Sequence, residues 1–214
     1  MLMDEIEVGV GPWPGGQQNW PLDDAGNLPD FYDTELLTQG DRRNVVDAYR
    51  YWKMEAIIAD LGRHRHGFHI AIENWGHDFN IGSVVRSANA FGVNQVHIVG
   101  RRRWNRRGAM VTDRYLQVNH FSEVADFANW AESQGLPIIG IDNIPGSKPI
   151  EKTELPEKCV LLFGEESQGL TAQAQEISET ILHITQFGST RSINAGAAAA
   201  IAMHRWVCEH ASIN

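Results

Sequence analysis

From residue 67 onward, short apolar runs alternate with longer segments that have the hydrophobic spacing of helices. The runs predict strands at 68–73, 95–100, 136–142, 159–164 and 180–185, and the segments between them predict helices at 81–91, 122–134, 171–178 and 192–210. Strands alternating with helices are typical of an α/β fold with a mostly parallel sheet and helices on both faces. In such sheets ligands bind beyond the carboxyl ends of the strands.

The residues before this pattern differ in character. Residues 1–41 are rich in Pro and Gly and contain Trp13 and Trp20, which indicates either a poorly ordered acidic tail or an arm whose tryptophans dock on the body or on a partner subunit. Residues 44–61 have helical spacing and predict a helical extension. The domains we expect are a 1–41 arm, a 42–66 helical extension and a 67–214 domain.

The last predicted helix has an unusual surface. Between Asn194 and Ile201 it contains only Ala and Gly. Alanine favours helices, but these turns lack the Leu or Ile that usually faces a core. So small a surface lets another backbone approach closely, and we expect a close neighbour there.

The charge distribution changes what the net charge of −9 implies about nucleic acid. Residues 1–41 hold nine acidic residues and no Lys or Arg, so the rest of the chain is neutral and local clusters decide what it binds. The segment RRRWNRR predicts a phosphate-binding loop with a stacking ring, and a solvated loop is the alternative. The RNA-binding candidates are Arg101, Arg102, Arg103, Trp104, Arg106 and Arg107, with 63–66 and Arg42/Arg43 as possible extensions.

Several classes of protein do not fit the sequence. The chain has no run of about 18 apolar residues, and its start lacks the pattern of a signal peptide, so we expect no membrane span and a cytoplasmic location. Cys159 and Cys208 sit in apolar patterns far apart, which favours two reduced, buried thiols. The histidines have no metal-ligand spacing, and we expect no metal.

Three segments carry polar residues near predicted strand ends. They are N-x-G-x-x-x-R at 80–86, G-x-E-x-x-G at 164–169 and S-x-N at 192–194. Taken singly, Asn80 would cap a helix, Arg86 would be a surface cation, and the glycines would form a turn. Ser192 and Asn194 would begin the last helix, whose free N–H groups favour an anion.

Together, in this order, the three segments resemble the SpoU (TrmH-like) family of RNA 2′-O-ribose methyltransferases in the SPOUT superfamily, over residues 67–210. The resemblance implies a C-terminal trefoil knot, S-adenosylmethionine bound in that knot, and a homodimer whose active site crosses the subunit interface. Knots are very rare and force backbones together, and either such a crossing or a tight dimer contact would explain the small residues at 195–200.

The resemblance also implies roles for single residues. Arg86 matches the family's catalytic arginine. The remaining active-site polar residues it implies are Asn80, Glu166, Ser192 and Asn194, and the cofactor-binding residues are Phe163, Gly164, Ile184, Gln186 and Ile193. The chain departs from the family's pattern in two places, with Thr185-Gln186 where Pro-Met is usual and Ala195-Gly196 where Val-Ser is common.

The function implied is methyl transfer from S-adenosylmethionine to a ribose 2′-hydroxyl of RNA. Arg86 would act either as the base or as a phosphate clamp that stabilises the oxyanion, and Ser192 would hold a phosphate. tRNA is favoured slightly because the sequence has no obvious separate RNA-binding domain. The alternatives are ribosomal RNA, a non-catalytic RNA-binding protein of the same fold, and a small-molecule methyltransferase, which would leave the arginine loop unexplained.

Overall fold

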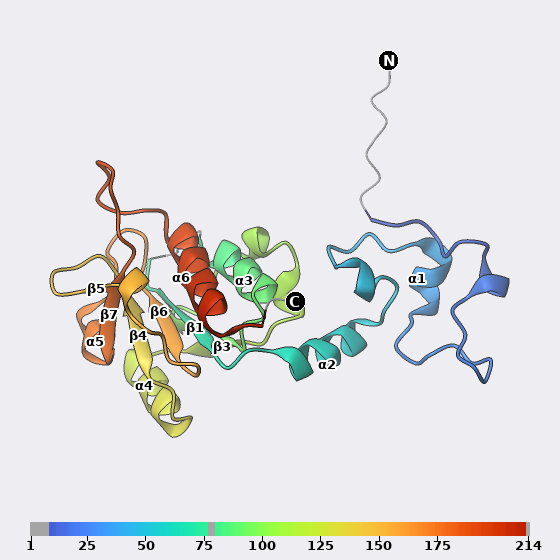
Figure 1. Ribbon diagram of the computed structural model, residues 1–214, viewed down its shortest axis with the longest axis horizontal. Coiled ribbons are helices and arrows are strands. Elements are labelled where there is room, and N and C mark those ends of the chain that lie inside the picture. The colour runs from blue at the N-terminus through green and yellow to red at the C-terminus, as the bar shows by residue number, and fades with distance from the viewer. Residues whose placement is uncertain (1–8, 77–79, 213–214) are drawn as a thin grey trace, which may run out of the picture. The chain divides into compact units, whose positions relative to one another are not determined.

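The computed structural model describes residues 9–76 and 80–212. They fall into two compact units, one up to Arg63 (unit 1) and one from His64 (unit 2), each drawn as a ribbon in Figure 1. The division lies inside the 42–66 segment that the sequence predicts as a separate extension. None of the helices in these two ranges is long and apolar enough to cross a membrane.

Unit 1 is organised around a buried carboxylate. Asp41 is fully buried, and its oxygens accept hydrogen bonds from the Arg43 guanidinium at 2.9 and 2.7 Å and from the Tyr51 N–H at 3.0 Å. Burial by itself would raise the pKa of Asp41, but the hydrogen bonds from Arg43 and Tyr51 outweigh it and hold that pKa at about 2. The elements of unit 1 are the helices α1 (Thr34–Gln39) and α2 (Met54–His64) and the 3-10 helices η1 (Gln17–Asn19) and η2 (Asp47–Tyr49).

The helix predicted at 44–61 begins ten residues later than expected, at Met54. The reason is local: Tyr51 has a φ of 63°, in the left-handed region, and its N–H bonds to Asp41 rather than within a helix. Some of the residues with this hydrophobic spacing pack in an aromatic cluster instead, in which the ring of Trp52 lies 4.2 Å from that of Phe31.

The acidic arm packs within unit 1. The ring of Trp13 lies 5.3 Å from that of Tyr51 and 6.1 Å from that of Tyr32, and its indole N–H donates to the Asn19 carbonyl at 2.7 Å. From residue 9 onward the arm therefore differs from a poorly ordered tail. Composition missed this because a few aromatic contacts and one buried carboxylate, rather than a periodic apolar pattern, order the segment.

Unit 2 is an α/β domain, as predicted. Its seven strands form one sheet in the order β3-β2-β1-β6-β4-β7-β5, and every neighbouring pair is parallel. The strands are β1 (His69–Asn74), β2 (Val96–Gly100), β3 (Val118–Phe121), β4 (Ile138–Ile141), β5 (Lys148–Pro149), β6 (Val160–Phe163) and β7 (Thr180–His183). The apolar runs predicted five of them. β3 and β5 were missed because they are short edge strands without a buried apolar run.

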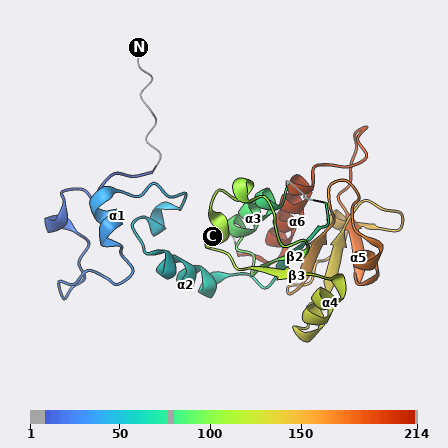
Figure 2. The ribbon, with the colours of Figure 1, turned by 180° about the vertical axis from the view of Figure 1, so that it is seen from behind.

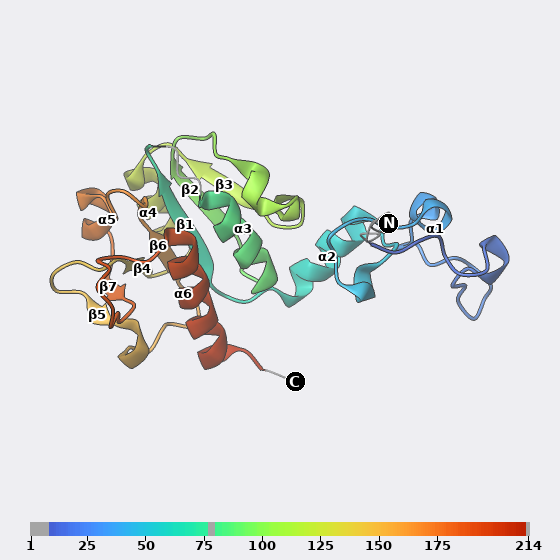
Figure 3. The same ribbon diagram turned by 90° about the horizontal axis from the view of Figure 1, so that it is seen from above.

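Helices cover both faces of this sheet, as Figures 2 and 3 show. The helices α3 and α6 pack on a core that includes Ile70 and Leu161, whereas α4 and α5 pack on a core that includes Ala71 and Leu162. Alternate residues of each strand thus face opposite helix layers. The elements are α3 (Ile81–Ala90), α4 (Val124–Ser133), α5 (Ala172–Glu176), α6 (Ala195–His210) and the 3-10 helices η3 (Arg106–Ala109), η4 (Thr112–Arg114) and η5 (Ile150–Lys152).

The close neighbour of the small-residue helix α6 is α3, which lies beside it in Figure 3. Gly196, Ala199 and Ala202 are buried. A Cβ on Gly196 would lie 3.4 Å from the Cβ of Ser83 at the start of α3, which is ordinary van der Waals contact, so the two helix starts lie next to each other. The trefoil knot stays a prediction from the resemblance.

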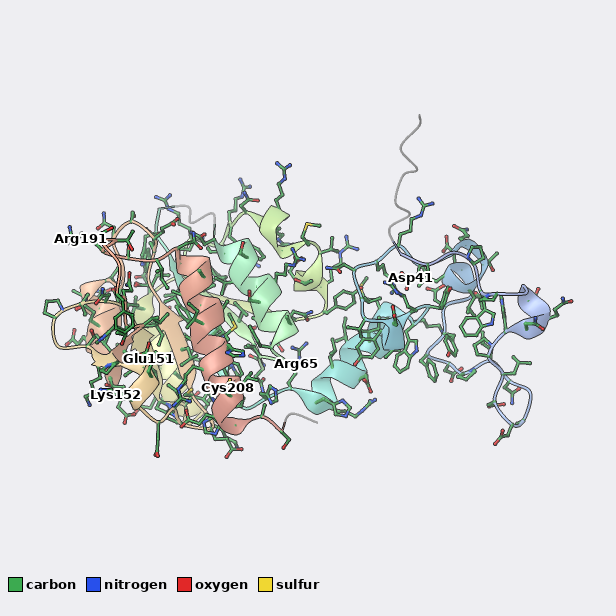
Figure 4. The ribbon with its side chains drawn as sticks, turned by 45° about the horizontal axis from the view of Figure 1, so that its top comes forward. Asp41, Arg65, Glu151, Lys152, Arg191 and Cys208 are labelled. Atoms are coloured by element: carbon green, nitrogen blue, oxygen red, sulfur yellow. The ribbon has the colours of Figure 1, made fainter. Side chains whose placement is uncertain are left out.

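The two cysteines are both free thiols, but only one is buried. Cys159 is fully buried, and burial raises the pKa of its thiol to about 12. Cys208 is exposed on α6, where Figure 4 labels it, so the expectation that both are buried is wrong. The error arises because Cys208 follows Trp206 by two positions and therefore lies on a different face of the helix.

Two histidines are buried between the sheet and α4. His69 on β1 and His97 on β2 lie with Nδ1 and Nε2 3.0 Å apart, and Trp130 packs with its ring 4.1 Å from that of His97. Burial lowers the pKa of His69 to about 4, and burial together with the charge of His69 lowers that of His97 to about 3. Both imidazoles are therefore neutral at physiological pH.

Candidate active site

A cavity of about 460 Å³ opens at the carboxyl ends of β4, β6 and β7, which are neighbours in the sheet. Each strand contributes the residues with which it ends or that follow it, such as Ile141, Phe163 and His183. The segment before α6 closes the cavity through Ser192 and Ile193. The cavity therefore lies where parallel α/β sheets bind ligands.

The turn at 164–169 forms one wall, and its glycines explain the spacing of the second motif. A Cβ on Gly164 would lie 2.0 Å from the carbonyl carbon of Gly169, so a side chain there is excluded. Gly169 has a φ of 69° and donates its N–H to the Glu165 carbonyl at 2.8 Å. Asp142 holds the exit of the turn by accepting from the Leu170 N–H at 2.8 Å.

Side chains from all three motifs meet beside this cavity. The Asn80 amide donates to Glu166 Oε2 at 2.7 Å, and the Asn194 amide donates to Glu166 Oε1 at 3.0 Å and to Asn80 Oδ1 at 2.8 Å. Each carboxylate oxygen thus has an amide donor, which sets the orientation of Glu166. Glu166 also lines the cavity. We call these three residues the amide–carboxylate cluster.

The helix caps differ from what the sequence predicts. Asn80 stands at the N-cap position of α3, but its side chain makes no capping hydrogen bond. Asn194 does cap its helix, because its Oδ1 accepts from the Ala197 N–H at 3.1 Å. As a result α6 begins at Ala195, and Ser192 lies in the preceding loop rather than at the helix start.

The structure gathers the predicted cofactor residues in one place. All five line the same cavity: Phe163, Gly164, Ile184, Gln186 and Ile193. Ser192 lines it as well. These residues come from three separate parts of the chain and were assigned only from the resemblance of their motifs to the family. In the structure they surround one cavity.

Arg86 does not join this group within the chain. It is exposed on α3, six residues beyond Asn80, and no hydrogen bond or ion pair connects it to another residue in 9–76 or 80–212. Its guanidinium is free for a ligand or for a second protein chain.

The arginine-rich loop is attached to the first motif. A Cβ on Gly82 would lie 2.8 Å from the Asn105 carbonyl oxygen and 2.9 Å from the Ala109 nitrogen, so the glycine lets the loop backbone rest on α3. At the end of β1, the buried Asn74 donates to the Arg101 and Arg103 carbonyls at 2.7 and 3.0 Å. These contacts hold the backbone while five arginine side chains stay exposed: Arg101, Arg102, Arg103, Arg106 and Arg107.

Trp104 differs from the expected stacking ring. It is half-buried against the core of unit 2, and the Arg106 guanidinium lies over its ring at 5.5 Å from the centroid. Arg106 also faces Asp113 at 3.6 Å. A base would have to displace Arg106 to stack on this ring, so the loop offers charge rather than an open aromatic face.

Two of the basic residues considered as extensions of this loop serve the fold instead. The Arg43 guanidinium binds Asp41 and donates to the Trp52 carbonyl at 2.8 Å. Arg65 donates to the carbonyls of Val93, at 2.9 Å, and Tyr115, and burial lowers its pKa. Sequence clustering cannot distinguish such structural arginines from exposed ones.

Two carboxylates that shape the site were not predicted. Glu151 accepts from both the N–H and the hydroxyl of Thr185 at 2.9 Å. Proline, which is usual in the family at position 185, has no N–H to donate. The hydrogen bond from the Thr185 N–H to Glu151 is therefore possible only because this chain has threonine there. The buried Glu73 binds the Thr171 N–H at 2.8 Å and hydroxyl at 2.6 Å. Neither glutamate stands in a motif, so the sequence offered no signal for them.

Within the two described ranges, no group of three or more His, Cys, Asp or Glu side chains is placed to hold a metal ion.

Comparisons with known proteins agree with this architecture. A tRNA (guanosine(18)-2′-O)-methyltransferase of Escherichia coli strain K12 is 22% identical over 147 residues, which are 67% of this chain and 64% of the relative. An uncharacterized tRNA/rRNA methyltransferase of Mycolicibacterium vanbaalenii is 28% identical over 141 residues, or 63% of this chain and 44% of the relative. The chain thus spans less than two thirds of the length of these relatives.

Solved structures share the fold. The SpoU methyltransferase AviRb from Streptomyces viridochromogenes, solved in complex with the cofactor AdoMet, matches 67% of this chain and 58% of its own, with a TM-score of 0.61 and 22% identity. The A. aeolicus TrmH/SpoU tRNA modifying enzyme matches 73% of this chain and 81% of its own, with a TM-score of 0.65 and 17% identity. The model of the SpoU rRNA Methylase family matches residues 67–204, which contain all three motifs and the cavity, and the chain therefore belongs to that family.

Proposed function

We propose that this protein transfers a methyl group from S-adenosylmethionine to a ribose 2′-hydroxyl of RNA. One observation carries the proposal: the cavity lined by the predicted cofactor residues adjoins the amide–carboxylate cluster, with Glu166 belonging to both. A ligand in the cavity is thereby placed next to fixed polar groups.

The cavity suits a cofactor of this kind. Its volume of about 460 Å³ falls in the range of small-molecule sites. Phe163, Ile184 and Ile193 supply apolar walls, while the 164–169 turn supplies peptide groups for a nucleoside. Bound there, S-adenosylmethionine would supply a methyl group on a sulfonium, whose leaving group is neutral.

The chain's own residues then have two tasks, which are to align the ribose and to assist removal of its proton. Asn80 and Asn194 hold Glu166 through hydrogen bonds of 2.7 and 3.0 Å, so the cluster is ordered before RNA arrives. Ser192 lines the same cavity, which supports our proposal that its hydroxyl donates to a phosphate of the RNA. This preorganisation lowers the cost of positioning the substrate.

Arg86 acts in this scheme either as the base or as a phosphate clamp. Free arginine has a pKa above about 12, which favours the clamp. Because Arg86 is exposed and unpaired within the described part of its chain, we propose that it reaches the cluster of a second protomer in a homodimer. The exposed apolar side chains of Ile201 on α6 and of Met110 and Val111 beside η4 support such a contact.

tRNA remains the favoured substrate, on a changed basis. The sequence-based argument was the lack of a separate domain, and unit 1 removes that argument. What supports tRNA is the group of relatives named as tRNA (guanosine(18)-2′-O)-methyltransferases, and the tRNA/rRNA relative keeps ribosomal RNA as the alternative. The exposed arginine loop fits either RNA.

The test is transfer of label from S-adenosylmethionine to purified total tRNA and, separately, to ribosomal RNA. We expect label in the tRNA pool that drops at least about 100-fold in Arg86→Ala. Arg86→Lys retains part of the activity if Arg86 clamps a phosphate and little if it is the base. Arg114→Ala, which removes another exposed arginine, serves as the matched control.

Label in ribosomal RNA alone would show that ribosomal RNA, rather than tRNA, is the substrate. If S-adenosylmethionine binds to the protein but neither pool is labelled, the non-catalytic RNA-binding alternative replaces this proposal. Activity of a monomeric form, shown by light scattering, would contradict the role of Arg86 across an interface.

A further inference from the structure

The loop between β7 and α6 presents an aromatic ring to solvent. Phe187 is 95% exposed, whereas the next most exposed large apolar side chain in the described ranges, Val46, is 64% exposed. No other ring in those ranges contacts that of Phe187. In Figures 1 and 2 the orange-red loop that carries it extends away from the sheet.

The loop is fastened on both sides of the ring, at one point before Phe187 and at two points after it. Glu151 binds both donors of Thr185, two residues before Phe187. Asn143 donates to the Arg191 carbonyl at 3.2 Å, and Asn194 ends the loop in the amide–carboxylate cluster. Figure 4 shows Glu151 and Arg191 on the same side of unit 2. A side chain on a fastened loop loses less entropy on binding than one on a free loop.

The surroundings of the ring favour a nucleic acid as its ligand. Gln186, the residue before it, lines the cavity, and so does Arg191, four residues after it. The residues between Phe187 and Arg191 are Gly188, Ser189 and Thr190, all small and exposed. The ring of Phe187 offers a flat apolar face to a base, and the guanidinium of Arg191 offers a positive charge to a phosphate. Their loop contains no acidic side chain, so the pair matches single-stranded RNA.

We propose that Phe187 stacks on an unpaired nucleobase of the RNA that this protein methylates, and so helps to place the target ribose at the mouth of the cavity. This inference rests on the proposed function and adds a positioning residue to it. It also states a substrate property, because the methylated nucleotide then lies in or beside an unpaired segment. Trp104, covered by Arg106, does not offer such a face.

The test compares Phe187→Ala and Phe187→Trp with the wild type, using RNA substrates that carry 2-aminopurine at single unpaired positions. Stacking quenches this base, so wild type and Phe187→Trp quench one position and Phe187→Ala does not. We expect Phe187→Ala to raise the Kd for RNA about 5- to 100-fold. Its affinity for S-adenosylmethionine, measured by calorimetry, stays unchanged. Thr190→Ala, in the same loop, is the control and behaves as wild type.

Equal RNA affinity and equal quenching in wild type and Phe187→Ala would overturn the inference. So would dissociation of Phe187→Ala into monomers in light scattering, because the ring would then belong to a contact between copies. Failure of the proposed function looks different: the wild-type protein then quenches the probe but transfers no methyl group to any RNA.

Discussion

Asn194 donates a hydrogen bond of 2.8 Å to Asn80, across 114 residues of sequence. This bond joins the starts of α6 and α3, and Glu166 binds both asparagines. The loop before α6, the cavity and the helix that carries Arg86 are therefore connected through one small group of side chains.

Asn80→Ala should impair activity more than stability. The change removes a donor to Glu166 and the acceptor of Asn194, and the hydrogen bond to the charged Glu166 is the stronger of the two. We expect methyl transfer to fall at least about 10-fold, with a small change in Tm because Asn80 caps no helix. The control is Ser83→Ala, an exposed residue one turn further along α3. Wild-type rates in Asn80→Ala would contradict the role of the cluster.

Gly82→Ala should destabilise unit 2 and weaken RNA binding together. The added Cβ meets the Asn105 carbonyl oxygen at 2.8 Å, so the arginine loop must shift, at a cost of about 1–3 kcal/mol. Urea unfolding and RNA affinity measure the two effects. Gly62→Ala is the matched control, because nothing lies within 4 Å of its Cβ and alanine favours a helix over glycine by about 0.8–1 kcal/mol. A neutral Gly82→Ala would disprove the contact.

The buried histidine pair should make unit 2 sensitive to acid. The pKa values of His69 and His97 are about 4 and 3 when folded, below the ordinary 6.5, so the unfolded chain binds more protons as the pH falls below 6.5. Stability from the pair is complete above pH 6.5 and declines toward pH 3–4. Urea midpoints between pH 7.5 and 4.5 measure the decline, and the double variant His69→Leu/His97→Leu should flatten it. An equal slope in both proteins would refute this assignment.

Reversing the charge of Arg101, Arg102 and Arg103 to Glu should weaken RNA binding and reduce its salt dependence. Each lost phosphate contact lowers the slope of log K against log salt by about 0.9 for duplex and about 0.7 for single strands. The control reverses three exposed lysines elsewhere in unit 2, Lys148, Lys152 and Lys158, and so makes the same change in net charge. Equal affinities for the two variants would show that net charge alone governs binding.

The sheet could be predicted from sequence where burial imposes a continuous apolar run. The strand 159–164 was recognised because β6 lies in the middle of the sheet with helices on both faces. β3 escaped because an edge strand is half-exposed and keeps polar residues such as Asn119. Unit 1 escaped for another reason: its order depends on Asp41 and on aromatic pairs far apart in sequence, which no local period reveals.

For the site, the order and spacing of the three motifs sufficed to name Asn80, Glu166 and Asn194. A motif is recognised from residue types and their spacing, and neither depends on knowing the tertiary structure. Only the tertiary structure decided which of them touch, that Arg86 lies apart from them, and that Glu151 holds Thr185. Local pattern determines helices and strands, since their hydrogen bonds and buried faces repeat at short range. Contacts between residues such as Asn80 and Asn194 depend on how distant segments pack, and that packing places Phe187 on the surface.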